Sequence, residues 1–162
     1  MAHSDFYGAH PDYRTRLSLL VRDPKDDVVG AALAVEDLME NEEVHAILGP
    51  EWSSQAKFVS DLGVKAQVPI ISFSATSPSL STRGSHYFVR TAYSDSSQVG
   101  ALAAIVQAYG WREIALVYED TDYGNGLVPY LVDAFQDVDA RISYRSVIRP
   151  ICRGCRRCKR AQ

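Results

Sequence analysis

The stretch Val44–Pro78, VHAILGPEWSSQAKFVSDLGVKAQVPIISFSATSP, decides the fold. It predicts a strand over Val44–Leu48, a helix that is opened by Ser53-Ser54 and runs from about Ser53 to Ala66, and a second strand over Pro69–Phe73. Both strands are short apolar runs, which is typical of a parallel sheet covered on two faces. A loop rich in small hydroxyl residues follows each strand. Because the carboxyl ends of parallel strands open onto one crevice, we expect a ligand site at this edge of the sheet.

The start of the helix favours an anionic ligand group. The first N–H groups of a helix have no partner within it, and a carboxylate placed there gains about 0.3–1 kcal/mol. The hydroxyls of Ser53 and Thr76 lie at positions from which they can add hydrogen bonds. Ser53 or Ser54 can instead act as the N-cap of the helix, a frequent role of serine. The sequence leaves both roles open, since neighbouring serines can divide them.

Strands and helices alternate along the rest of the chain. Asp23 is expected to cap a helix that has Pro24 at its first position and ends near Asn41, and Asp95 and Gln98 have the spacing of a capping box. The further strands are expected at Arg16–Val21, Tyr87–Arg90, Ile114–Tyr118 (buried) and Arg141–Ile148, and the further helices from Asp95 to a stop at Gly110 and from about Gly126 to Gln136. This order predicts an α/β fold of doubly wound parallel sheets with right-handed crossovers.

The pattern starts again near Thr91–Ser94, which predicts two lobes. We assign residues 1–92 to the first lobe, residues 93–148 to the second, and residues 149–162 to a basic, cysteine-containing tail that is expected to be disordered. In a cleft between the lobes, Asp95 and Tyr123 would oppose Ser53 and Thr76. Hydroxyls suit a carboxylate, whereas an acid and an aromatic ring suit an ammonium. The arrangement is that of a site for a free α-amino acid.

Composition excludes several classes of protein. The 162 residues are 46% hydrophobic and 23% charged, as in ordinary globular chains. Six of the 17 Lys and Arg lie between Arg149 and Arg160, so residues 1–148 carry a net charge of about −9, which disfavours nucleic-acid binding. The first residues lack the pattern of a secretory signal, and no apolar run approaches the ~20 residues of a membrane helix. We therefore expect a soluble chain.

Other chemistry is weakly indicated. Cys152, Cys155 and Cys158 have CxxCxxC spacing, but they are three thiols and zinc usually takes four ligands, so the metal site is a minor alternative and we expect no cofactor. His45 would lie ~10 Å or more from the Ser53 loop by strand geometry, and no G-x-S-x-G turn is present. No catalytic residue is therefore assigned. The acidic turn at residues 119–122 is better explained as solvated than as a calcium site.

Five segments carry a resemblance to a known family: ILGPEWSSQAKFV, QVPIISFSATSPSLS, YFVRTAYSDSSQ, YGWREIALVYEDTDYGNGLVPYL and DARISYRSVI. They resemble the amino-terminal ligand-binding region of plant glutamate-receptor-like channels. More broadly they are similar to the type I periplasmic-binding-protein fold of bacterial amino-acid-binding proteins and animal metabotropic glutamate receptors. The resemblance covers Asp5–Ile148. It implies two hinged lobes that close on a small ligand.

The resemblance also implies roles for particular residues. The carboxylate-binding serine of the family falls on Ser53, backbone and hydroxyl contacts on Ser74, Ala75 and Thr76, the ammonium-binding acid on Asp95, and the aromatic contact on Tyr123. The implied function is that of a non-enzymatic, extracellular receptor region of a ligand-gated cation channel at the plasma membrane. The implied partners are an amino-acid-like ligand and the other subunits of a homo- or hetero-oligomer.

The chain departs from the family in three places. Relatives have a strand and a helix before the equivalent of residues 5–7, and the resemblance ends after Ile148, so we expect an incomplete bilobal fragment. Leu17–Val21 would then lose a sheet neighbour, and the chain would be poorly stable and bind weakly. Trp52 would narrow the site. The alternatives are a solute-binding protein of an amino-acid transporter and, in another class, a doubly wound enzyme.

Overall fold

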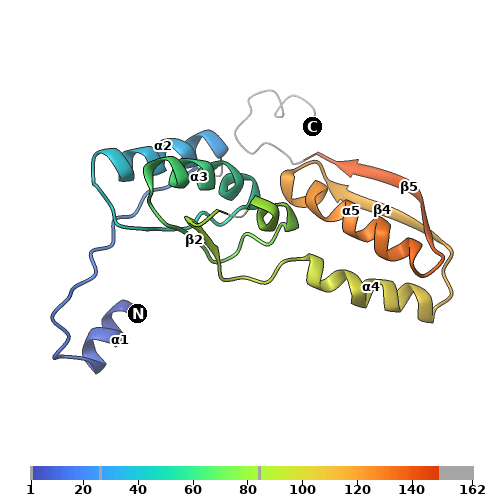
Figure 1. The fold of residues 1–162 in the computed structure, drawn as a ribbon, viewed down its shortest axis with the longest axis horizontal. Helices are drawn as coiled ribbons and strands as arrows, with labels where there is room; N and C mark the ends of the chain where they lie inside the picture. The colour runs from blue at the N-terminus through green and yellow to red at the C-terminus, as the bar shows by residue number, and fades with distance from the viewer. Residues whose placement is uncertain (1, 26, 84, 150–162) are drawn as a thin grey trace, which may run out of the picture.

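A computed structural model of the chain describes residues 2–25, 27–83 and 85–149. Its elements alternate as an α/β fold with parallel sheets, as predicted (Figure 1). In order they are α1 (Ala2–Ala9), α2 (Val28–Glu40), β1 (Ile47–Leu48), α3 (Ser53–Ala66), β2 (Ile70–Ser72), the 3-10 helix η1 (Pro78–Arg83), β3 (Phe88–Arg90), α4 (Ser96–Ala108), β4 (Glu113–Glu119), α5 (Asp122–Gln136) and β5 (Arg141–Ile148). We call α1 to β3 lobe 1 and α4 to β5 lobe 2. The residue boundaries 1–92 and 93–148 stay a prediction.

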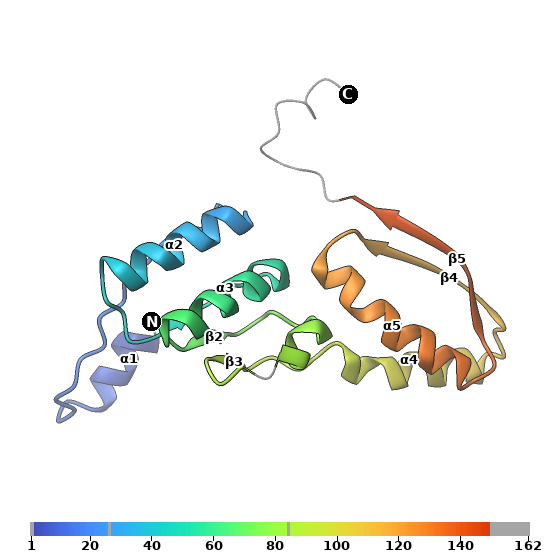
Figure 2. The same ribbon diagram turned by 45° about the horizontal axis from the view of Figure 1, so that its top comes forward.

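Lobe 1 is built on a parallel sheet with strand order β1-β2-β3. Helices α2 and α3 lie side by side over this sheet (Figure 2). Val35 of α2, Val59 of α3 and Ile70 of β2 belong to the buried core between them. Gly63 permits the close contact of α3 with β2, because a Cβ there would lie 2.5 Å from Cγ1 of Ile70. The start of α3 is thereby fixed above the ends of the strands.

Lobe 2 contains a two-stranded parallel sheet, β4-β5, with its helices on one side (Figure 2). Leu131 and Phe135 of α5 are buried against α4 and against the residues of β4 that face the helices. The expectation of a buried strand is wrong for β4, because exposed residues such as Val117, which is 57% exposed, alternate with partly buried ones such as Leu116. Among the described residues, helices cover one face of this sheet, so burial alternates along the strand.

The predicted strand Arg16–Val21 does not form. This segment joins neither sheet, and Leu17, Leu19 and Val21 are exposed. The backbone N–H of Leu17 donates instead to the hydroxyl of Tyr7, at 2.7 Å. A strand needs a neighbour for its backbone groups, so an apolar run without one stays an irregular extended segment. In lobe 1, β1 likewise buries Ile47 and leaves Leu48 exposed, so the expected cover on two faces is wrong there.

Two helices begin at other residues than predicted. Helix α2 begins at Val28, with Asp27 as its cap, because Lys25 has a φ of +55° that interrupts any helix begun at Asp23. Helix α5 begins at Asp122 and not near Gly126, because the hydroxyl of Thr121 accepts from the N–H of Gly124 and caps the earlier turn. The predicted ranges of α3 and β5 and the stop at Gly110, which has a φ of +66°, are confirmed.

Candidate functional site

A cleft of about 440 Å³ lies where the ends of the lobe 1 strands face the beginning of α5. Both lobes contribute to its lining. Lobe 1 provides Glu51, Trp52, Ser53, Ser54, Ser74 and Thr76, and lobe 2 provides Glu119, Thr121 and Tyr123. The volume is within the usual range of small-molecule sites, about 300–1,000 Å³. The geometry therefore suits a small polar ligand held between two walls.

The lobe 1 wall is the beginning of α3. Trp52 occupies the N-cap position and makes no side-chain hydrogen bond to the helix. Ser53 is the first helical residue and not the cap, so the capping role left open for it is wrong. Its Oγ accepts instead from the backbone N–H of Ser77, at 3.2 Å. The first N–H groups of α3 therefore receive no capping hydrogen bond from the Trp52 side chain, and Ser53 and Ser54 of this turn line the cleft.

Hydrogen bonds tie the loops after β1 and β2 together beneath the cleft. The hydroxyl of Ser74 donates to the carbonyl of Glu51 at 2.8 Å, and that of Ser72 donates to the carbonyl of Pro50 at 2.8 Å. The backbone N–H of Ala75, which is fully buried, donates to Oγ of Ser72 at 3.2 Å. Ser74 thus lines the cleft, whereas Ala75 lies in the core below it. These bonds make the lobe 1 wall a rigid support.

A second polar group joins Thr76 to the beginning of α4. Oγ1 of Thr76 donates to Oδ2 of Asp95 at 2.8 Å, and Nε2 of Gln98 donates to Oδ1 at 3.1 Å. The predicted capping box is wrong in its detail, because the Asp95 side chain makes no hydrogen bond to the helix backbone. Asp95 is 8% exposed, so its carboxylate is held behind Thr76 and is not among the cleft-lining residues.

Tyr123 closes the cleft from lobe 2. Partial burial raises the pKa of its hydroxyl, and the charge of Asp95, a hydrogen bond with Asp95 and the charge of Glu119 raise it further. A hydrogen bond with Thr76 acts in the opposite direction. The phenol is therefore neutral at physiological pH and lies beside the Thr76–Asp95 pair. Its side chain is 48% exposed, so part of the ring faces the cleft.

The structure thus gathers most of the predicted residues at one place. Ser53, Ser74, Thr76 and Tyr123 line the cleft. Glu51, Glu119 and Thr121 also line the cleft, although the sequence did not predict them as site residues. Glu119 directly follows the predicted strand Ile114–Tyr118 and Glu51 lies three residues after Leu48, which is a signal for this edge of a sheet. No group of three or more His, Cys, Asp or Glu in the described ranges could hold a metal, and the three cysteines lie outside those ranges.

The model of the family described as "receptor family ligand binding region" matches residues 1–158. The chain belongs to this family. Within it, the chain is 55% identical over 150 residues to glutamate receptor 2.4 of Arabidopsis thaliana and 53% identical over 150 residues to glutamate receptor 2.1. Each match covers 93% of this chain and 17% of the relative. This receptor-region chain therefore spans about a sixth of the length of the curated relatives it matches.

Solved structures show the same fold. An ABC transporter substrate-binding protein from Desulfitobacterium hafniense in complex with Leu matches with a TM-score of 0.75 and 21% identity, covering 93% of this chain and 45% of that one. A leucine-binding protein from Thermotoga maritima matches with a TM-score of 0.75 and 23% identity, covering 87% and 41%. The type I periplasmic-binding-protein fold is confirmed. The sequence relatives are named as glutamate receptors, and the solved structures as a substrate-binding and a leucine-binding protein.

In the described part of the chain, no helix is both long enough and apolar enough to cross a membrane.

Proposed function

We propose that this chain is the extracellular ligand-binding region of a glutamate-receptor-like, ligand-gated cation channel, and that its cleft binds a small amino-acid-type ligand between the lobes. The observation that carries the proposal is the joint lining of one cleft by the beginning of α3 and by Tyr123 of α5. The parent receptor would be a plasma-membrane protein that assembles as a homo- or hetero-oligomer. The relatives that support this proposal are named as glutamate receptors.

The ligand carboxylate belongs at the beginning of α3. There the N–H groups of the first turn and the positive end of the helix dipole favour an anion. Ser53 accepts from Ser77, so its own hydroxyl proton is available for donation to the ligand. The hydroxyls of Ser54 and Thr76 lie on the same wall.

The ligand ammonium belongs on the opposite side. Glu119 supplies a carboxylate there, and the ring of Tyr123 supplies a face for a cation. The charge of Asp95 also acts on the Tyr123 hydroxyl, so it adds to the negative potential around this ring. A zwitterionic amino acid fits the two walls in one orientation, because reversing it would place like charges together at both ends.

The alternative function, a solute-binding protein of a transporter, shares the fold. Sequence favours the receptor, because this chain is 55% identical to a glutamate receptor and 21% identical to the leucine-bound transporter protein. Likeness at the lower identity carries the fold and not the function.

Nuclear magnetic resonance titration of the 162-residue chain tests the proposal, using L-leucine, L-alanine and L-glutamate as probes. At least one probe should shift the backbone resonances of Ser53, Ser54 and Thr76. Thr76→Ala should weaken its binding by about 1–3 kcal/mol, the cost of leaving a polar group without a partner. Ser97→Ala, at an exposed position of α4, is the matched control. Unchanged resonances at the beginning of α3 with all three probes would reject the proposal.

A further inference from the structure

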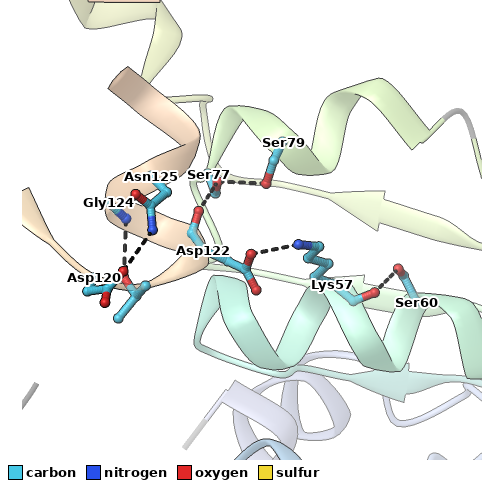
Figure 3. Close-up of polar contacts among 9 residues, drawn as sticks. Lys57, Ser60, Ser77, Ser79, Asp120, Asp122, Gly124 and Asn125 are labelled. Carbon is cyan, nitrogen blue, oxygen red and sulfur yellow. Dashed lines mark hydrogen bonds and ion pairs between the residues drawn. The ribbon is translucent and has the colours of Figure 1, made fainter. Parts of the chain in front are cut away.

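Two contacts hold the first turn of α5 against lobe 1 (Figure 3). Nζ of Lys57, on α3, lies 2.6 Å from Oδ1 of Asp122, the first residue of α5. The hydroxyl of Ser77 donates to the backbone carbonyl of the same Asp122, at 3.1 Å. A side chain and a backbone group of one residue therefore bind two separate parts of lobe 1. None of these three residues lines the cleft.

Ser77 connects the two walls of the cleft. It is fully buried. Its backbone N–H donates to Ser53 at the beginning of α3, and its hydroxyl donates to Asp122 at the beginning of α5. A hydroxyl has one proton, so in its 2.9 Å contact with Ser79 the hydroxyl of Ser79 is the donor. The position of α5 is thus linked by hydrogen bonds to the position of α3.

Gly126 permits this approach. It lies one turn after Asp122 on α5, and a Cβ at this position would lie 2.3 Å from Oγ of Ser77. To avoid that contact, Ser77 would have to turn its hydroxyl away from the carbonyl of Asp122 or the helix would have to move. By contrast, nothing lies within 4 Å of a Cβ added at Gly100, on α4. The two glycines therefore make a matched pair for an experiment.

We propose that Lys57, Ser77 and Asp122 form an inter-lobe clasp whose role is to position Tyr123 in the cleft. Asp122 and Tyr123 are adjacent in the first turn of α5, and Ser77 and Thr76 are adjacent in the loop after β2. Fixing Asp122 on Ser77 therefore fixes Tyr123 beside Thr76 and Asp95. This inference rests on the proposed function, because it assigns positioning residues to that binding site.

The clasp combines a screened contact with a buried one. The side chains of Lys57 and Asp122 are 38% and 42% exposed, so salt weakens their attraction. The hydrogen bond from the buried Ser77 is shielded from solvent and should not depend on salt. High ionic strength should therefore weaken the clasp without abolishing it.

Electron spin resonance distance measurement tests the clasp without any ligand. Spin labels are placed at exposed Glu40 and Gln136, one on each lobe, in a chain whose three tail cysteines are replaced by serine. Lys57→Glu and Asp122→Lys should each lengthen and broaden the distance distribution. The double variant should restore it, because the pair is rebuilt with the charges exchanged. Lys65→Glu, at an exposed position of α3, is the control for a charge change on the same helix.

Binding of whichever of L-leucine, L-alanine and L-glutamate binds the parent chain most tightly, measured by titration, is the second readout. Each single charge variant should weaken it about tenfold, and the double variant should recover it. Gly126→Ala should weaken it similarly, while Gly100→Ala should not. Far-ultraviolet circular dichroism melts of all variants verify that they fold.

The outcomes separate the clasp from the proposed function. Unchanged distances in both single variants, or no recovery in the double variant, would overturn the clasp. Altered distances that recover in the double variant, together with no binding of L-leucine, L-alanine or L-glutamate by the parent chain, would support the clasp and overturn the proposed function.

Discussion

Both lobes place helices on a parallel sheet, but their strands differ in length. In lobe 1 the strands are two or three residues long, and in lobe 2 they are seven and eight residues long. Both lobes bury an amphipathic helix against the sheet. In lobe 1, loops rich in hydroxyl residues follow the short strands and line the cleft. In lobe 2, the first turn of a helix lines it.

The difference shows that pairing and not propensity sets the length of a strand. The apolar run Arg16–Val21 finds no neighbour and remains outside the sheet. Residues 141–148 are no more apolar, yet all of β5 is a strand because β4 runs beside it from Glu113 to Glu119. A backbone segment becomes a strand only where another strand satisfies its hydrogen bonds.

The largest expected effect comes from the core of lobe 2. Phe135→Ala should destabilise the chain by about 3–5 kcal/mol, because the ring is 5% exposed and its removal leaves a cavity. Urea denaturation measures the loss, and amide hydrogen exchange shows which lobe opens. Ile105→Ala, on an exposed side of α4, is the control. Equal loss of protection in both lobes would contradict their description as separate cores.

The corresponding change in lobe 1 is Ile70→Ala. Ile70 is fully buried and contacts α3 at Gly63, so we expect a loss of about 2–5 kcal/mol. Leu33→Ala, at an exposed position of α2, should change the unfolding free energy by less than about 0.5 kcal/mol. If Ile70→Ala reduced the protection of amides from hydrogen exchange in lobe 2 and left it unchanged in lobe 1, the assignment of this core would be wrong.

A smaller effect concerns the junction of the lobes. Thr76 and Asp95 share a hydrogen bond across the junction, so their alanine substitutions should not be additive. A double-mutant cycle on unfolding free energy should give a coupling of about 0.5–3 kcal/mol. The pair Thr76 and Asp133, with Asp133 exposed on α5, is the control cycle and should be additive. Additivity in the first cycle would show that the junction bond contributes nothing.

The smallest effect is a pH dependence from Tyr123. Its folded-state pKa is raised above the ordinary value of 10.0, so the unfolded chain releases the proton first as the pH increases. Its contribution to stability is therefore complete below about pH 10 and is lost as the pH rises toward the higher folded pKa. Tyr123→Phe should flatten this decline in urea denaturation between about pH 8 and about pH 11. Tyr144→Phe, on exposed β5, is the control, and an equal flattening there would contradict the assignment.

The candidate cleft was predictable in part. Ser53 and Thr76 were placed together because strand ends in a parallel sheet share one edge, and the structure puts both on one cleft wall. Ala75 was predicted to contact the ligand through its backbone. Its N–H instead donates a hydrogen bond to Oγ of Ser72 in the core. Lys57 and Asp122 are 65 positions apart, and neither belongs to a local pattern that indicates the other.

The sequence by itself determined the alternation of helices and strands, the helix at Ser53–Ala66 and the hydroxyl loops at the ends of the strands. Those features depend on spacing and on neighbours within a few residues, which the chain order specifies. Only the tertiary structure decided that Arg16–Val21 pairs with no strand. It also decided that Ser53 accepts a hydrogen bond from Ser77 and does not cap α3, and that Lys57 forms an ion pair with Asp122. These outcomes depend on which distant groups come within hydrogen-bonding distance, and folding sets those distances.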